Sequence, residues 1–393
     1  MEPGRSGPSG AGASEDAAAL HEAIVLASRG LVDREALVEL VVLSAVAREH
    51  MLVIGPPGTA KSEAVRRIAR RLRGRYFEYL LGRFTEPSEI FGPIDLRKLK
   101  EGLVETEIKG MLPEAEIAFL DEVFLGSTAI LNTLLGMLNE RTFARGHTRI
   151  TVPLRVCVGA SNRLPDDEQL AAFADRFLVR AFVEPIGDSG LEELLAAGWT
   201  LQGDGAGSGP PLMEHVERLA KQASSMDPAP VRGAIARAVR QLRSAGIEWT
   251  DRRVVRSQRL VTAAAALAGR SRPTNADLWP LVFALPTAEA QRLGRDVLRD
   301  LLAHSESAAL AAAAAEGSLG PLARAAKLVR EGDALLADAP SDPAEKQAYL
   351  LRVEGLAREI DAGFTAESMP PDLRALRARV ASTIRPEKAA SGA

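Results

Sequence analysis

The chain has 393 residues with a formal net charge of −3, a length that allows about two or three domains. The near-neutral charge and 4% aromatic content argue against nucleic-acid binding, because neither a basic field nor stacking platforms are expected. The sequence shows no signal peptide and no run of about 18 apolar residues, and its single cysteine, Cys157, permits no internal disulfide, so we expect a cytoplasmic protein without membrane insertion.

The N-terminal part predicts a disordered segment followed by helices. Residues 1–15 are rich in Gly, Pro and Ser, which is typical of disorder. Residues 16–29 and 33–49 show the apolar spacing of helices, and Asp33 is a candidate N-cap for the second of them.

The segment 51–62 predicts a phosphate-binding loop. An apolar strand, Met51–Ile54, leads into a turn made of Gly55, Pro56, Pro57, Gly58, Thr59, Ala60, Lys61 and Ser62. Backbone N–H groups of such a turn and of the helix that follows surround an anion. We predict that the loop binds ATP, that Lys61 reaches the β- and γ-phosphates, and that Ser62 holds Mg²⁺. Ala60 replaces the usual glycine, which is tolerable if residue 60 has helical backbone angles; a turn without a ligand is the alternative.

A basic helix is expected at 63–73 and a second strand at 76–80. Short alternating stretches between glycines predict a hairpin at 92–112.

A third strand carries two carboxylates at its end. The apolar run 117–120 has the pattern of a buried parallel strand, and ligands bind at the carboxyl ends of such strands. We therefore predict that Asp121 binds Mg²⁺ through water and that Glu122 activates the attacking water. A strand that ends in a charged turn is the alternative.

Two polar residues further along the chain complete this set. A helix at 127–140 and a hairpin at 142–152 precede a strand at 154–158, after which comes Asn162. Asn162 is a candidate to hold the attacking water or to contact the γ-phosphate, unless it only caps the strand. Arg176 is either a solvated helix residue or an arginine that reaches the nucleotide of a neighbouring subunit.

Beyond residue 200 the composition changes from α/β to all-α. Residues 201–209 are typical of a linker, and helices are expected at 211–225, 229–245, 251–268 and 274–285. Thr250 or Asp251 is a candidate cap before the arginine pair 252–253. The rest of the chain predicts further helices, for which no chemistry is apparent.

Together these motifs resemble an AAA+ ATPase of the MoxR branch, and most of all its RavA-type members. The likeness covers residues 20–285 and lies in the stretches GPPGTAKS (55–62), FEYLLGRFTEPSEIFGPID (77–95), LPEAEIAFLDEVF (112–124), AILNTLLGMLNERTF (129–143) and ASNRLP (160–165). Alanine at position 60 is ordinary in this branch. The resemblance implies that Asn162 is sensor 1, Arg176 the arginine finger, and Arg252 or Arg253 sensor 2, with Arg252 favoured by its position in the motif.

The resemblance also implies an assembly and a domain layout. We expect a disordered N-terminus at 1–15, an α/β AAA+ core with a parallel sheet at 16–200, an all-α lid at 210–285 and a C-terminal helical region at 286–393. The family forms hexameric rings that act on protein clients with a partner containing a von Willebrand factor A (vWA) domain. Arg252 would then serve the nucleotide of its own subunit and Arg176 that of the next, with a lid hinge near 200–210. A nucleotide-dependent scaffold with little hydrolysis is the alternative function, although such a scaffold does not need Glu122.

Overall fold

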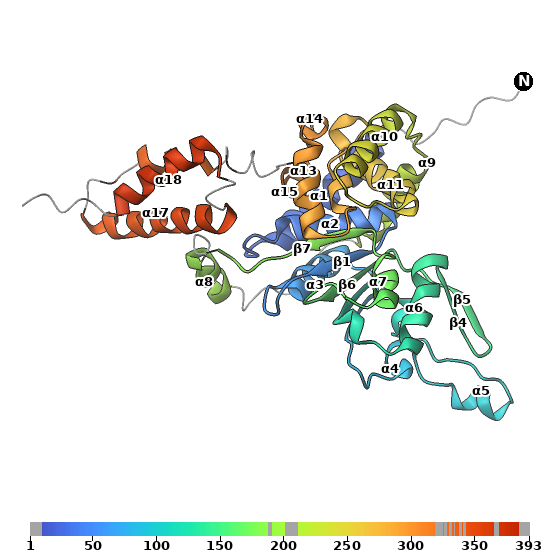
Figure 1. Ribbon diagram of the computed structural model, residues 1–393. Helices are drawn as coiled ribbons and strands as arrows, with labels where there is room; N and C mark the ends of the chain where they lie inside the picture. The colour runs from blue at the N-terminus through green and yellow to red at the C-terminus, as the bar shows by residue number, and fades with distance from the viewer. Residues whose placement is uncertain are drawn as a thin grey trace, which may run out of the picture. The chain divides into compact units, whose positions relative to one another are not determined.

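A five-stranded parallel sheet lies within the larger of two compact units (Figure 1). The computed structural model describes residues 10–187, 191–200, 211–318, 343–364 and 369–384, with scattered positions between 325 and 340. The larger unit comprises residues 1–185 and 203–318, and the smaller one residues 186–202 and 319–393. The predicted linker at 201–209 and hinge near 200–210 therefore fall almost entirely outside the described residues.

The strand order places the predicted site strands side by side. The order is β2-β3-β6-β1-β7, and the bounds are β1 Met51–Ile54, β2 Tyr76–Leu80, β3 Ile117–Asp121, β6 Val156–Ser161 and β7 Val179–Phe182. All pairs are parallel, so the carboxyl ends of β3, β6 and β1 meet at one edge. The strands expected at 51–54, 76–80, 117–120 and 154–158 are confirmed, the last with shifted bounds.

Alternate side chains of the central strands enter two different cores. Met51 and Val53 of β1 pack into a core on one face of the sheet, while Leu52 and Ile54 pack into the core on the other. This period of two is the geometry of a strand buried on both faces. It explains why these strands appear in the sequence as continuous apolar runs.

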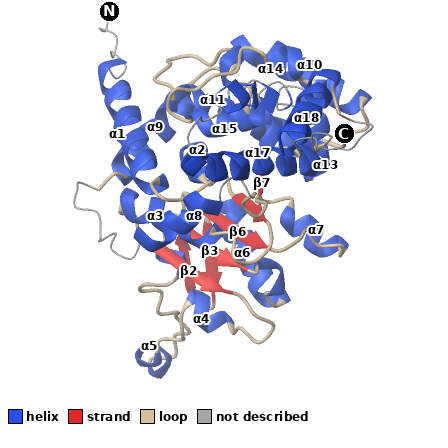
Figure 2. Cartoon of the chain, turned by 90° about the vertical axis from the view of Figure 1, so that its left-hand side faces the viewer, coloured by secondary structure: helices blue, strands red, loops and turns tan. Residues whose placement is uncertain are grey.

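Helices from both ends of the larger unit share the first of these cores. Its members come from α1 (Gly10–Ser28), α2 (Glu35–Ala47), α3 (Lys61–Leu72), α9 (Met213–Ser225), α10 (Ala229–Ser244), α11 (Asp251–Leu267), α12 (Pro280–Phe283) and α15 (Ala311–Ser318). The same unit also contains α13 (Ala288–Val297) and α14 (Arg299–Leu302). Figure 2 shows α2, α9, α10, α11 and α15 on one side of the sheet. Helices within the expected lid at 210–285 share this core with the α/β part, and the larger compact unit includes residues up to Ser318.

Three local predictions are wrong. Helix α1 begins at Gly10, inside the segment expected to be disordered, of which residues 1–9 are not described. Asp33 does not cap α2, because its φ of 54° turns the backbone and Arg34 occupies the N-cap position without a side-chain cap. The helix expected at 274–285 is broken into a 3₁₀ turn at Asn275–Asp277 and the short α12.

The segment 92–112 forms an arm that doubles back on itself as predicted, but it has little strand structure and contains a helix that was not expected. Asp95 accepts hydrogen bonds from two backbone N–H groups and starts the short helix α5 (Leu96–Lys100), and only an isolated bridge joins Ile94 to Thr106. The hairpin predicted at 142–152 is confirmed as β4 (Thr142–Arg145) and β5 (Thr148–Thr151). Thr106 N–H donates to Thr148 Oγ1 at 2.8 Å, so α5 and the hairpin project together from the sheet (Figure 1).

The other face of the sheet carries α6 (Thr128–Glu140) and α7 (Glu168–Ala174), with the short α4 (Pro87–Phe91) beside them. The smaller unit contains α8 (Leu191–Thr200), α17 (Pro343–Gly363) and α18 (Pro371–Ile384), and α17 and α18 pack around their own apolar core. Within the described part of the chain, none of the helices has the length and hydropathy needed to cross a lipid bilayer.

Glu39 on α2 is a buried carboxylate at the N-terminus of α15. Its Oε2 accepts a 2.6 Å hydrogen bond from Ala313 N–H and its Oε1 a 3.3 Å bond from Ala312 N–H. Burial raises the pKa of Glu39 to about 7, although both hydrogen bonds favour the charged form. The folded protein therefore binds this proton more tightly than the unfolded chain does.

We expect Glu39 to make the protein less stable as the pH rises from about 4.5 to about 7. Its stabilising effect is complete below the unfolded pKa of 4.5 and is lost as the pH passes the folded value of about 7. In Glu39→Gln residue 39 stays uncharged at every pH. The decrease in the free energy of unfolding between about pH 4.5 and 7 should therefore be smaller than in the wild type by roughly 3 kcal/mol. Urea denaturation of both proteins between about pH 4 and 8 measures the difference, and parallel profiles would contradict the assignment.

Candidate functional site

The predicted phosphate-binding loop connects β1 to α3 through a turn that requires glycine. Gly55 N–H donates to Ser161 O at 3.1 Å, and a Cβ on Gly55 would lie 2.2 Å from Val183 O. Gly58 has a φ of 79°, and a Cβ there would meet nothing within 4 Å. The loop is therefore held between β6 and β7 at its base and is open at Gly58, where an anion has room.

Ala60 does not have the helical backbone angles that the sequence suggested. Its φ of 59° and ψ of 23° lie in the left-handed region, which glycine adopts readily and alanine does not. Alanine at this position is therefore held there by its surroundings.

Lys61 is buried and lies across the loop. Its Nζ donates to Gly55 O at 2.7 Å and to Pro56 O at 2.8 Å. Burial lowers the pKa of Lys61, while the charges of Asp121 and Glu122 act in the opposite direction. The lysine thus shares the electrostatic field of the two carboxylates that follow β3.

The structure brings the predicted carboxylates and Asn162 together. Glu122 has a φ of 48° directly after β3, and its N–H donates to Asp121 Oδ1 at 3.0 Å. Asn162 Nδ2 donates to Glu122 Oε1 at 2.7 Å. Burial, and secondly the charge of Asp121, raises the pKa of Glu122, while Lys61 lowers it. Ser62 lies in the first turn of α3 and is half-buried, as is Asp121.

Arg34 contacts the loop from the side of β7, and no pattern of residues predicted this contact. Its Nε donates to Thr59 O at 2.9 Å, and its two terminal nitrogens donate to Glu184 O at 2.7 Å and to Asp33 O at 2.6 Å. The residue is 6% exposed. In the sequence it is one arginine beside an acidic pair, a pattern typical of a solvated helix start.

Arg176 lies at the opposite end of the strands from the loop of the same chain. It precedes β7, whose first residue, Val179, pairs with the first residue of β1. The loop follows the last residue of β1, and four residues of strand span roughly 13 Å. Arg176 is therefore unable to contact a phosphate bound near Lys61 of the same chain.

Arg252 also lies at this opposite edge, away from the loop of its own chain. Arg252 Nη2 donates to Asn139 Oδ1 at 2.6 Å. Asn139 lies near the end of α6, where Leu138 O bonds His50, the residue before β1. Burial lowers the pKa of Arg252, and the positive charge of Arg176 contributes to this shift. The two arginines therefore influence each other at the amino-terminal edge of the sheet.

Arg253 is a structural residue of this edge. Its side chain is 3% exposed, and the guanidinium pairs with Asp175 at 3.0 Å and donates to the carbonyls of Phe177, Leu178 and Ala284. All of its donor groups are thus used within the chain. Of the arginine pair that sequence reasoning left open, only Arg252 remains available for a ligand.

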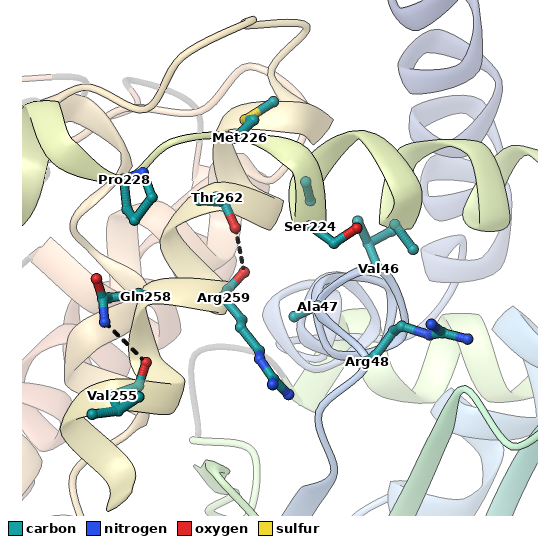
Figure 3. Close-up of a pocket in the computed structure, with 12 residues that line it drawn as sticks. Val46, Ala47, Arg48, Ser224, Met226, Pro228, Val255, Gln258, Arg259 and Thr262 are labelled. Carbon is teal, nitrogen blue, oxygen red and sulfur yellow. Dashed lines mark hydrogen bonds between the residues drawn. The ribbon is translucent and has the colours of Figure 1, made fainter. Parts of the chain in front are cut away.

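The buried Glu49 fastens α11 to the same edge. Its carboxylate pairs with Arg259 at 3.1 Å and with Arg256. A hollow of about 440 Å³ lies beside it, between the ends of α2 and α9 and the helix α11 (Figure 3). Arg48 and Arg259 line this hollow, and none of the predicted ATP-binding residues does.

A family comparison identifies the chain. The model of the bpMoxR family, described as the MoxR domain in the MoxR-vWA-beta-propeller ternary systems, matches residues 18–221, more than half of the sequence. The chain belongs to the bpMoxR family. The predicted MoxR-type AAA+ membership is thereby confirmed at the level of the family.

Several individual proteins are also similar to this bpMoxR chain. The protein MJ0812 of Methanocaldococcus jannaschii is 36% identical over 249 residues, which cover 63% of this chain and 66% of that protein. MJ0079 of the same organism is 44% identical over 156 residues, 39% of this chain and 41% of that one. Chaperone MoxR1 of Mycobacterium tuberculosis is 27% identical over 178 residues, 44% of this chain and 46% of MoxR1. The chain thus spans less than two thirds of the length of these curated relatives.

The fold prediction is also confirmed. A solved protein structure from Cytophaga hutchinsonii superposes with a TM-score of 0.57 at 15% identity, covering 76% of this chain and 98% of that one. At this identity the likeness shows the fold alone: a parallel sheet with flanking helices followed by a helical part.

Proposed function

We propose that this bpMoxR chain is an ATPase that remodels or matures a protein client. The observation that carries the proposal is the contact between Glu122 and Asn162 at 2.7 Å, beside the loop that holds Lys61. A protein that only binds nucleotide needs the loop and the lysine. A carboxylate held by an amide at the same edge of the sheet is the arrangement that activates a water molecule.

The residues of the loop fit a nucleoside triphosphate. The open space at Gly58 and the N-terminus of the twelve-residue helix α3 favour a phosphate group. Lys61 now donates to two loop carbonyls and can exchange them for phosphate oxygens. Ser62 and Asp121 would hold Mg²⁺, which neutralises phosphate charge when bound. Glu122 would accept the proton of the attacking water while Asn162 keeps its carboxylate in place.

The site is incomplete without a second subunit. Arg176 and Arg252 lie at the edge of the sheet opposite their own loop. We therefore propose that the chain forms a ring, expected to be a hexamer, in which both arginines reach the ATP of the neighbouring subunit. An arginine that arrives in this way neutralises charge that develops on the transferred phosphoryl group.

The family description supports a partner with a vWA domain, because it places the domain in MoxR-vWA-beta-propeller systems. We propose such a partner, an unidentified protein client and a cytoplasmic location for this chain. The particular likeness to RavA-type members remains a prediction. A net charge of −3 and 4% aromatic residues do not favour nucleic acid as the client.

Steady-state phosphate release from ATP and Mg²⁺ tests the proposal directly. We expect turnover by the wild-type chain, measured at a concentration at which rings form. Tight ATP binding without turnover in such rings would favour a nucleotide-dependent scaffold instead.

Lys61→Ala is expected to weaken ATP binding strongly. The variant removes the main cationic partner of the phosphates, whose charge-assisted hydrogen bonds are about twice as strong as neutral ones. Titration calorimetry with ATP measures the loss. Lys98→Ala is the control. Lys98 belongs to the arm at 92–112 and not to the loop, so this variant should bind ATP as the wild type does. Unchanged affinity in Lys61→Ala would show that the loop is not the phosphate site.

A further inference from the structure

Arg34 fastens the phosphate-binding loop at one peptide bond. Its guanidinium bonds three backbone carbonyls and no carboxylate: Thr59 in the loop, Glu184 after β7 and Asp33 beside it. Arginine suits this task because its planar group offers donors in several fixed directions, which lysine does not. The Thr59 carbonyl is therefore held toward the β7 side of the loop.

The direction of the Thr59 carbonyl sets the direction of the next N–H group. In a trans peptide the C=O and N–H groups point in opposite directions. The Ala60 N–H therefore points away from Arg34 and β7. Among the described residues, no acceptor bonds to this N–H. It is thus free to donate to an anion in the loop.

Alanine at position 60 makes this orientation of the Thr59–Ala60 peptide unfavourable in conformational free energy. A φ of 59° is unfavourable for alanine, and a half-turn of the Thr59–Ala60 peptide would return it to negative φ. The same half-turn would direct the Ala60 N–H away from the loop. Without a restraint on the Thr59 carbonyl, the loop would therefore favour the conformation that binds phosphate poorly.

We propose that Arg34 is a positioning residue of the phosphate-binding loop, and that it is required because residue 60 is alanine and not glycine. By holding the Thr59 carbonyl it keeps the Ala60 N–H available to the phosphates. The inference rests on the proposed function, since the anion is a phosphate group of a nucleotide. A purely structural role for Arg34 would not depend on the residue at position 60.

The dependence on residue 60 gives the test. Affinity for ADP, which is not hydrolysed, is measured by calorimetry for Arg34→Met made in the wild-type chain and in Ala60→Gly. Glycine adopts positive and negative φ about equally, so without Arg34 about half of the loops would keep this orientation. We expect Arg34→Met to weaken binding by about tenfold or more with Ala60 and by only about twofold with Gly at this position. Arg34→Lys in both backgrounds gives the same comparison if Arg34→Met does not fold.

Arg180→Met is the matched control. Arg180 is also 6% exposed and donates to a backbone carbonyl, that of Pro286, but it has no contact with the loop. Its effect on ADP binding should be the same in both backgrounds. Equal losses for Arg34→Met in both backgrounds, or no loss with Ala60, would overturn the inference alone. A wild-type chain that binds neither ADP nor ATP would overturn the proposed function and this inference with it.

Discussion

Glu122→Gln is expected to keep ATP binding and to reduce steady-state hydrolysis by about 10²-fold or more. Glutamine cannot accept the proton of the attacking water, yet its carbonyl can still accept the 2.7 Å hydrogen bond from Asn162. The loop and its lysine keep their partners. The loss of turnover therefore reports on proton transfer and not on the shape of the site. Phosphate release and ATP affinity, measured on the same preparation, separate the two effects.

Glu116→Gln is a matched control for this prediction. Glu116 lies just before β3, at the opposite end of the strand, and accepts the Arg75 N–H at 2.9 Å. The control should hydrolyse ATP as wild type does. Equal turnover in Glu122→Gln and wild type would show that another group acts as the base. The pKa of Glu122 is raised, so the carboxylate becomes protonated at a higher pH than an ordinary glutamate does. As the pH is lowered, the turnover of the wild-type chain should therefore begin to fall at a correspondingly higher pH.

The sequence was sufficient for the parts of the site that follow one another along the chain. Residues 55–62, the pair Asp121 and Glu122, and Asn162 each stand directly after an apolar strand, so a parallel sheet brings them to one edge. Their mutual contacts follow from that topology. The fold class was predictable for the same reason, because buried parallel strands and amphipathic helices have different periods of apolar residues.

Features that depend on contacts between distant segments were not predictable. The three carbonyl partners of Arg34 belong to segments up to 150 positions away, and carbonyl partners leave no trace in the sequence. The left-handed angles of Ala60 were missed because alanine rarely adopts them. The packing of α11 on the amino-terminal edge of the sheet was not predictable either. Its position is fixed by contacts between distant residues, such as those of Glu49 with Arg256 and Arg259.

The position of α11 changes the expected origin of Arg252 in the assembled site. Arg176→Ala should leave folding and ATP binding nearly intact and reduce hydrolysis by about 10³-fold or more, as expected for an arginine finger. Arg252→Ala should act in the same direction. Arg240→Ala, an exposed arginine on α10, is the control and should hydrolyse ATP as wild type does.

Mixed rings test whether Arg176 acts on the neighbouring subunit. In rings that contain both Arg176→Ala and Glu122→Gln subunits, some interfaces pair an intact Glu122 with an intact Arg176 from the next subunit. We expect part of the activity to return. Co-elution of two differently tagged variants shows that mixed rings form. If they form and activity stays absent, Arg176 acts within its own subunit or only in the structure.

A second mixture decides where Arg252 acts. If both arginines come from one subunit, rings that mix Arg176→Ala with Arg252→Ala contain no complete pair, because every donor subunit lacks one of the two. We therefore expect no return of activity in this mixture, whereas Arg252→Ala mixed with Glu122→Gln should regain some. Recovery in the mixture of Arg176→Ala with Arg252→Ala would mean that Arg252 serves its own subunit. It would require α11 to leave the edge where Arg252 now bonds Asn139 at 2.6 Å and Arg253 pairs with Asp175 at 3.0 Å. Because Arg253 is buried in its carbonyl and carboxylate contacts, such a movement would disrupt the shared core, and the structure favours the first outcome.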